Sequence, residues 1–187
     1  MKSIYIFLAL FLLAQIVYSQ EHIEEIRVKG LIKNEFLGKD APKILCSKFF
    51  NGKIDIKKNL KIIYFMPNPF IEKIYKKKDN NDIKGANKYM NSLYEKIGND
   101  VQIIGIADPD DDVTADVNKF KTYLKKRNIK FLVGIDKTNK KGNLLTFGAY
   151  KRGIVPYIFL VNKKNKIVWE GIPQKISKKI IKEKIKD

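Results

Sequence analysis

The chain has 187 residues, with 38 lysines and arginines against 20 aspartates and glutamates, a formal net charge of +18 at pH 7, one cysteine and one histidine. This length suits one domain with a substantial core and is short for two. A single cysteine excludes an internal disulfide, a dithiol pair and a cysteine-rich metal site, and the single histidine, His22, argues against a zinc site or a histidine-dependent catalytic triad. We therefore expect neither a metal nor a cofactor.

The positive charge has two explanations. It could attract nucleic acid, anionic lipid or acidic proteins. The lysines are spread along the whole chain, however, and the only arginines are Arg27, Arg127 and Arg152, which is typical of biased codon usage. We favour compositional bias, and we do not expect nucleic acid as a partner, particularly if the protein is secreted.

Residues 1–19 have the pattern of a secretory signal peptide. A charge at Lys2 precedes the apolar run from Ile4 to Leu13, and the small residue Ser19 suits a cleavage site. A membrane anchor is the alternative, but this run is well short of the roughly 20 residues that cross a bilayer. We expect cleavage after Ser19, a location in the secretory pathway or outside the cell, and no transmembrane span in the mature chain.

Residues 20–37 are polar and then weakly alternating, which indicates an edge strand or an extended arm before a domain at 38–187. A turn at 38–42 opens this domain, and Asn51-Gly52 marks a second turn. Between these turns, Cys46 follows two apolar residues. Free cysteine in such surroundings is usually a small buried hydrophobic residue, so this interpretation is favoured over a reactive thiol.

The central pattern of the chain is a strand that stops at a sharp corner. The apolar run from Ile62 to Met66 contains β-branched and aromatic residues and ends at Pro67, which predicts a buried strand. A helix is expected to follow, because Asn68 suits the N-cap and Pro69 suits the first helical position. Such corners often form active sites, since N–H donors and the positive end of the helix dipole meet there. This corner has no nucleophile and no acid–base pair.

The rest of the chain alternates between helical and extended patterns, according to the spacing of its apolar residues. The expected elements are a helix at 83–97, a strand at 101–107, a helix at 117–124, a strand at 131–135, a short helix at 144–150, a strand at 153–161, a hairpin turn at 162–165, an antiparallel strand at 166–171 and a lysine-rich helix through 176–185. This order predicts an α/β fold, in which a central mixed sheet has helices on both faces and is followed by a C-terminal β-hairpin plus a closing helix.

The acidic cluster at 108–116 is the only one in the chain. A calcium loop of the EF-hand kind needs glycine at its sixth position and glutamate at its twelfth, whereas those positions, counted from Asp108, hold Val113 and Lys119. We therefore expect a strand-to-helix loop whose aspartates face the N-terminus of the next helix, and no metal.

Three stretches, at 38–42, 62–73 and 152–173, carry a resemblance to a known family. Together they resemble the thioredoxin-like redoxins of the TlpA and AhpC/TSA type, over residues 38–173. The resemblance implies a thioredoxin-like fold. It also implies that the proline leading the strand at 153–161 is cis and lies beside the active-site corner.

The resemblance also indicates what this chain lacks. In one alignment of the corner, Phe70 and Lys73 occupy the positions of the two cysteines of the CxxC motif. In an alignment with the peroxiredoxin corner, Ile74 occupies the position of the peroxidatic cysteine. None of these side chains can replace a thiolate nucleophile. Cys46 belongs to the family's first strand region, away from the helix end that activates the usual thiol, so the chain is expected to be a degenerate member without catalytic residues.

These features lead to the hypothesis of a non-catalytic thioredoxin-fold protein of the secretory pathway that binds a polypeptide partner. The resemblance implies that the former active-site groove holds an extended segment by backbone pairing beside the cis-proline. The expected groove residues are Pro67, Asn68, Phe70, Ile71, Val155 and Pro156. An exposed Phe70 would offer an apolar contact, whereas the alternative is that its ring packs inward.

Two other functions stay open. One is a thiol-disulfide oxidoreductase or redoxin-type antioxidant that works with a single cysteine, Cys46. The other is a basic adhesive protein for anionic surfaces. The sequence does not name the partner, and it leaves the oligomeric state and the final compartment open.

Overall fold

The computed structural model describes residues 35–55, 57–58, 60–67, 81–109, 112–151 and 156–185. The compact unit that these residues form begins at Phe36, two residues before the expected start of the domain. The ring of Phe36 is only 7% exposed and packs on Tyr150 and Phe159, with ring centroids 6.2 and 5.6 Å away. An aromatic anchor in the core therefore sets this boundary. The expected signal peptide at 1–19 and most of the arm at 20–37 lie outside the described residues.

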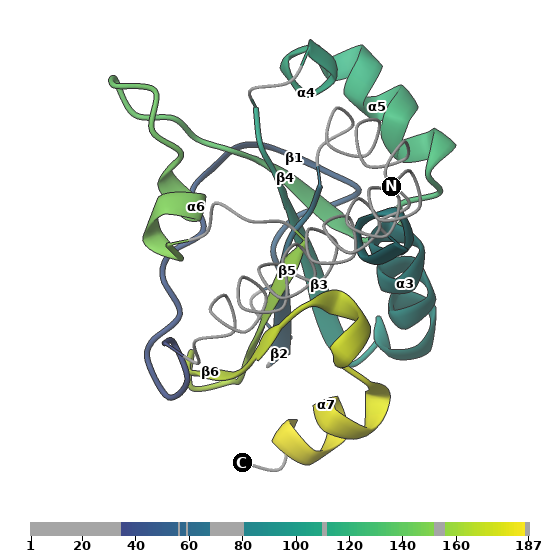
Figure 1. Ribbon diagram of the computed structural model, residues 1–187, viewed down its shortest axis with the longest axis vertical. Helices are drawn as coiled ribbons and strands as arrows, with labels where there is room; N and C mark the ends of the chain where they lie inside the picture. The colour runs from purple at the N-terminus through teal and green to yellow at the C-terminus, as the bar shows by residue number, and fades with distance from the viewer. Residues whose placement is uncertain are drawn as a thin grey trace, which may run out of the picture. The chain divides into compact units, whose positions relative to one another are not determined.

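Six strands form one sheet, which is mixed as expected, although no strand was predicted at 46–50 (Figure 1). They are β1 (Cys46–Phe50), β2 (Leu60–Phe65), β3 (Val101–Ala107), β4 (Leu132–Asp136), β5 (Tyr157–Val161) and β6 (Ile167–Gly171). Their order across the sheet is β1-β4-β3-β2-β5-β6. β2, β3 and β4 are parallel, β1 is antiparallel to β4, β5 is antiparallel to β2, and β6 forms the antiparallel hairpin with β5. The carboxyl ends of the three parallel strands thus lie at the same end of the sheet.

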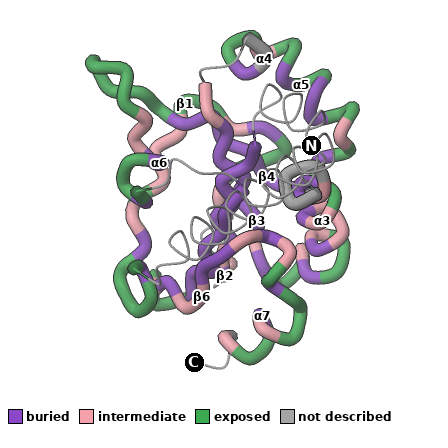
Figure 2. Tube along the Cα trace, viewed as in Figure 1, coloured by how far each residue is buried: buried purple, intermediate pink, exposed green. Residues whose placement is uncertain are grey.

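Helices cover both faces of this sheet. The helices are α3 (Asn81–Ile97), α4 (Asp112–Ala115), α5 (Val117–Lys126), α6 (Leu145–Ala149) and α7 (Lys178–Ile185), with a 3-10 helix η1 (Pro173–Lys175). Residues of α3, α5 and α7 join the core on one face, and Phe147 of α6 joins a second core on the other face, with Phe36. Figure 2 shows that the buried residues are concentrated in the central strands. The predicted α/β sheet with a C-terminal hairpin and closing helix is confirmed.

The spacing of apolar residues explains how α3 packs. Its buried residues Ala86, Met90, Leu93 and Ile97 are three or four positions apart, so they share one face of the helix. The helix ends at Ile97, and the N–H of the following glycine donates to the carbonyl oxygen of a residue four positions earlier, at 2.7 Å. The expected helix and its glycine stop are therefore confirmed.

Several strand boundaries differ from the prediction, and two of the differences have a clear cause. β4 ends at Asp136 rather than at Ile135, because the backbone pairing continues by one residue to Cys46 of β1. β5 starts at Tyr157 rather than at 153. Pro156 has no N–H for the ladder, which explains why the described strand begins directly after it.

In its described part, the acidic cluster leads into a helix, as expected. Asp116 is the N-cap of α5, and its Oδ1 accepts hydrogen bonds from the N–H groups of Asn118 and Lys119, at 2.8 and 3.1 Å. These backbone hydrogen bonds, that of Lys119 foremost, lower the pKa of Asp116. Within the described ranges, no group of three or more potential metal ligands is present.

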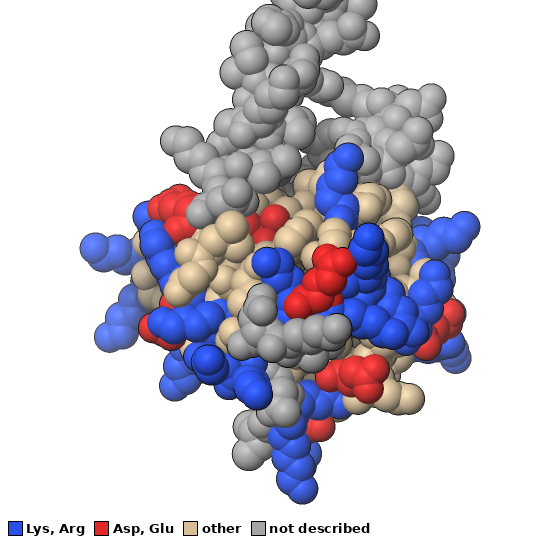
Figure 3. Space-filling view, turned by 90° about the horizontal axis from the view of Figure 1, so that it is seen from below, with Lys and Arg blue, Asp and Glu red and all other residues tan. Residues whose placement is uncertain are grey.

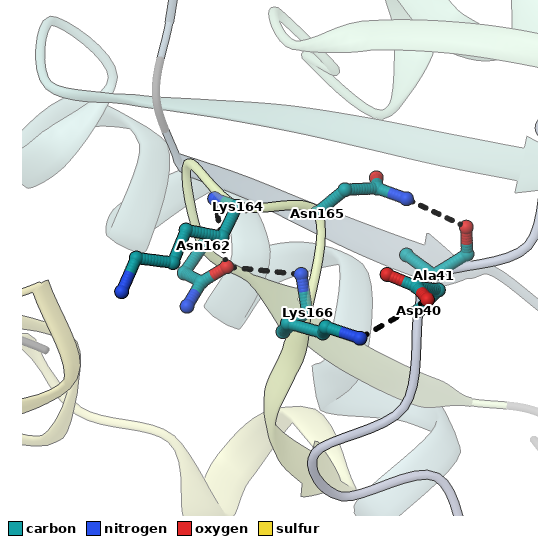
Figure 4. Close-up of polar contacts among 6 residues, drawn as sticks. All are labelled: Asp40, Ala41, Asn162, Lys164, Asn165 and Lys166. Atoms are coloured by element: carbon teal, nitrogen blue, oxygen red, sulfur yellow. Dashed lines mark hydrogen bonds and ion pairs between the residues drawn. The ribbon is translucent and has the colours of Figure 1, made fainter.

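The two edges of the sheet differ. At the β6 edge, the segment 38–41 pairs with the hairpin, where the N–H of Gly38 donates to the carbonyl oxygen of Ile167 at 2.8 Å. Lys166 also forms an ion pair with Asp40, with Nζ 3.0 Å from Oδ2 (Figure 4). At the opposite edge, β1 pairs with β4, and the part of the sheet that the structure describes has no strand beyond it.

Candidate functional site

The predicted corner lies where β2 ends beside the start of β5. These strands are antiparallel neighbours, in which Phe65 is the partner of Tyr157. Continuing this register by one residue sets Met66 opposite Pro156, so the chain leaves β2 towards Pro67 beside the point where it enters β5. Met66 stays in the sheet, because its N–H donates to a carbonyl oxygen of β3 at 3.1 Å. The corner thus lies at the carboxyl end of two parallel strands, where α/β folds commonly place binding sites.

An aromatic cluster supports this corner from the α6 side. Phe65 is fully buried, and its ring contacts those of Phe147, Tyr150 and Phe159, with centroid distances of 4.7, 5.3 and 5.9 Å. Such pairs stabilise a fold beyond the effect of the area they bury. Sequence reasoning did not find this cluster, because its members come from distant parts of the chain.

The structure describes two of the six predicted groove residues. Pro67 and Pro156 are both buried, and the pairing of β2 with β5 brings their chain segments together. The residues that lie outside the described ranges are Asn68, Phe70, Ile71, Val155 and also Lys73. The binding role of all six groove residues stays a prediction.

Cys46 begins β1, which is three positions from β2 in the sheet, so this residue is distant from the corner in the sheet order. Its side chain is partly buried against Gly134 of β4, where an added Cβ would lie 2.5 Å from the sulfur. Burial raises the pKa of the Cys46 thiol to about 12, and the negative charge of Asp136 contributes to the shift. This environment favours the buried hydrophobic role over a reactive thiol.

Comparison with solved structures identifies the fold. A thioredoxin-like protein in its oxidised form matches with a TM-score of 0.58 and 15% identity, over 78% of this chain and 93% of that chain. The thioredoxin domain of a thiol-disulfide oxidoreductase from Bacteroides vulgatus matches with a TM-score of 0.53 and 15% identity, over 78% and 91%. The chain has a thioredoxin-like fold. A thiol-disulfide isomerase from Corynebacterium glutamicum also matches, with a TM-score of 0.52 and 19% identity over 71% and 86%.

At 15–19% identity, these matches establish the fold. No family model matches the chain, and no match was found among curated protein sequences. The expected thioredoxin-like fold is confirmed, and with a single cysteine the chain has no CxxC pair. No helix among the described residues is long and apolar enough to cross a membrane.

Sequence reasoning missed a buried carboxylate in this thioredoxin-like fold, that of Asp136. It is 1% exposed, and its oxygens accept hydrogen bonds from the N–H groups of Lys137, Thr146 and Phe147, at 2.8 to 3.0 Å. The Thr146 hydroxyl in turn accepts from the N–H of Leu45 at 3.0 Å. This network ties the end of β4 to the start of α6 and to the chain entering β1. An aspartate at the end of an apolar strand, nine residues before a short helix, was the available signal.

The Cys46 thiol is expected to resist alkylation in the folded protein. With a pKa of about 12, about one thiol in ten thousand is ionised at about pH 8, and the ionised fraction rises tenfold with each pH unit up to the pKa. Iodoacetamide labelling, followed by mass spectrometry across a pH series, measures this directly. The same protein in concentrated guanidinium chloride is the control and should label rapidly. Rapid labelling of the folded protein near neutral pH would contradict the buried role.

Proposed function

We propose that this chain is a non-catalytic thioredoxin-fold protein of the secretory pathway that binds an extended polypeptide segment at the former active-site groove. In this proposal, Pro67, Asn68, Phe70 and Ile71 form one side of the groove, and Val155 and Pro156 form the other. The single observation that carries the proposal is the pairing of Phe65 with Tyr157, which brings the corner after β2 beside the start of β5.

Two further observations support a binding role over a catalytic one. The corner sequence contains no cysteine, and Cys46 is on an edge strand with a raised thiol pKa. The buried aromatic rings beneath Phe65 hold the end of β2 in place. Fixing the groove before binding reduces the entropy lost when a segment docks. The secretory location rests on the pattern of residues 1–19.

The redox alternative requires Cys46 to act as a thiolate. Its environment opposes ionisation, and sulfur at the start of β1 is not next to the corner in the sheet order. The adhesive alternative requires a concentrated positive surface, whereas Figure 3 shows lysines and arginines distributed across one face, with fewer carboxylates among them. We therefore place polypeptide binding first.

Phe70→Asp is expected to weaken binding of an unfolded polypeptide by at least about tenfold, because burial of a phenyl ring is worth about 1.5–3 kcal/mol. A reduced and carboxymethylated protein that cannot fold serves as the probe, and its affinity is measured by fluorescence anisotropy. Leu37→Asp is the matched control, since Leu37 is an exposed apolar residue, 42% exposed, in the segment before β1. The control should bind as tightly as the unchanged protein.

Each of the two rival functions predicts a different result, one in the binding assay and the other in an assay of thiol chemistry. Adhesion to anionic surfaces predicts binding that is lost with added salt and retained in Phe70→Asp. Residual thiol chemistry predicts disulfide reduction or peroxide consumption that disappears in Cys46→Ser. Either result would overturn the proposal.

A further inference from the structure

We propose that the outer edge of β1 and the adjoining side of α5 form a second binding surface, which takes an extended acidic segment of a partner protein. This surface lies away from the corner. Phe50 at the end of β1 pairs with Val133 near the beginning of β4, whereas the corner is at the carboxyl ends of the parallel strands. The inference therefore stands independently of the function proposed above.

A groove lies beside the outer edge of β1. The four consecutive residues 48–51 line one wall of a hollow of about 670 Å³, and Lys121, Leu124 and Lys125 of α5 line the other. Neighbouring side chains on a strand point to opposite faces. A hollow that touches residues 48, 49 and 50 in succession therefore reaches the edge of this strand. An edge strand beside a helix is the geometry in which an added strand can pair with the backbone and contact the helix with its side chains.

Among the described residues, one edge of the sheet is covered by another segment and the other is not. The β6 edge is covered by residues 38–41, which form backbone hydrogen bonds with the hairpin. Across the part of the chain that the structure describes, no segment pairs with the outer edge of β1. An uncovered edge presents N–H and C=O groups that an extended peptide can satisfy.

The charge of the groove selects the partner. Lys48, Lys121 and Lys125 are exposed and line the groove, and no carboxylate is among its described lining residues. A second copy of this chain, with a net charge of +18, would bring the same lysines against one another. Carboxylates on an incoming strand would instead pair with them. Charge complementarity therefore favours an acidic partner over self-association.

The floor of the groove is apolar and held in place. Phe50, Leu124 and Ile129 are buried there. The side-chain amide of Asn51 donates to the carbonyl oxygens of Ile129 and Phe131, at 2.8 and 3.1 Å, and so fixes the end of β1 to the chain that enters β4. A strand that alternates acidic and β-branched residues would match this surface. Its carboxylates would all point to the α5 side, where the lysines are, and its β-branched residues would favour the extended backbone that pairs with β1.

The test uses the acetylated, amidated and fluorophore-labelled peptide Glu-Val-Glu-Val-Glu-Val-Glu and the purified protein. Anisotropy should show saturable binding, and NMR should place the largest amide shift changes at 48–51 and on α5. A peptide with lysine at every glutamate position should not bind. The same peptide N-methylated at every residue keeps the charge but cannot donate a backbone hydrogen bond from either edge, and it should bind at least about tenfold more weakly.

The protein variant for this test is Lys121→Glu combined with Lys125→Glu. Reversing both charges should weaken binding by about tenfold or more at low salt, because two attractive pairs become repulsive. The matched control is Lys163→Glu combined with Lys164→Glu, which changes the net charge equally at exposed residues of the β5–β6 hairpin and should bind nearly as the unchanged protein does. Circular dichroism checks that both variants are folded, and Lys48→Glu tests the β1 wall separately.

Three results would overturn the inference. An equal loss of peptide affinity in the Lys121→Glu/Lys125→Glu variant and in its hairpin control would indicate that the peptide is attracted by net charge alone. Equal binding of the N-methylated peptide would exclude strand pairing. Concentration-dependent association of the protein through β1 in the absence of peptide would identify a second copy as the occupant.

Discussion

Gly134→Ala is expected to lower the free energy of unfolding by about 3 kcal/mol, the upper end of the cost of overpacking a core. A Cβ at this position of β4 would lie 2.5 Å from the Cys46 sulfur and 2.8 Å from a ring carbon of Phe49. Both atoms belong to β1, which pairs with β4, so the two strands would have to separate or the side chains would have to leave their positions. Urea unfolding followed by circular dichroism measures the loss.

The cause can be isolated with a double-mutant cycle. Cys46→Ala removes the sulfur, so adding it to Gly134→Ala should recover part of the lost stability, with a coupling energy of about 1 kcal/mol or more. Gly148→Ala in α6 is the matched control, since no atom lies within 4 Å of its added Cβ. That change should leave stability unaltered or raise it slightly, because alanine favours helix over glycine. A Gly134→Ala protein as stable as the control would show that β1 and β4 can adjust freely.

The fold was predictable from the sequence because its main signals are local. The apolar run from Ile62 to Met66 predicted β2, which ends at Phe65, and the helical spacing through Ile97 predicted α3. The hairpin of β5 and β6 follows from one turn between two apolar strands. These patterns need no knowledge of distant contacts, so they determined the element types even where a boundary moved by one or a few residues.

The features that sequence reasoning missed depend on contacts between distant residues. Phe36 was assigned to an arm, because no local pattern shows that its ring packs against Phe159 of β5 in the core on one face of the sheet. The groove beside β1 requires the strand order, which places β1 at an edge and α5 beside it. The buried state of Asp136 likewise depends on α6 returning to the end of β4. A charged residue is predicted to be exposed unless the neighbouring sequence offers it a partner, because charged side chains are rarely buried without one.

Asp136→Asn is expected to lower the free energy of unfolding by about 3 kcal/mol, because a buried carboxylate that accepts several N–H bonds would be replaced by a group with one acceptor oxygen. The new NH2 group would replace one of the two oxygens, so either the N–H of Phe147 or that of Lys137 would lose its acceptor, while Thr146 would keep one. Urea unfolding measures the loss. Asp116→Asn is the matched control, since Asp116 is an exposed N-cap and asparagine caps helices nearly as well.

The same variant makes a second, independent prediction for Cys46. Removing the negative charge of Asp136 should lower the pKa of the thiol from about 12, and burial, the larger cause, should keep it above the ordinary value. Alkylation of the folded Asp136→Asn protein should therefore be faster than that of the unchanged protein at every pH below about 12, and slower than that of the unfolded chain. An unchanged alkylation profile in a folded, destabilised variant would mean that the carboxylate stabilises the network without influencing the thiol.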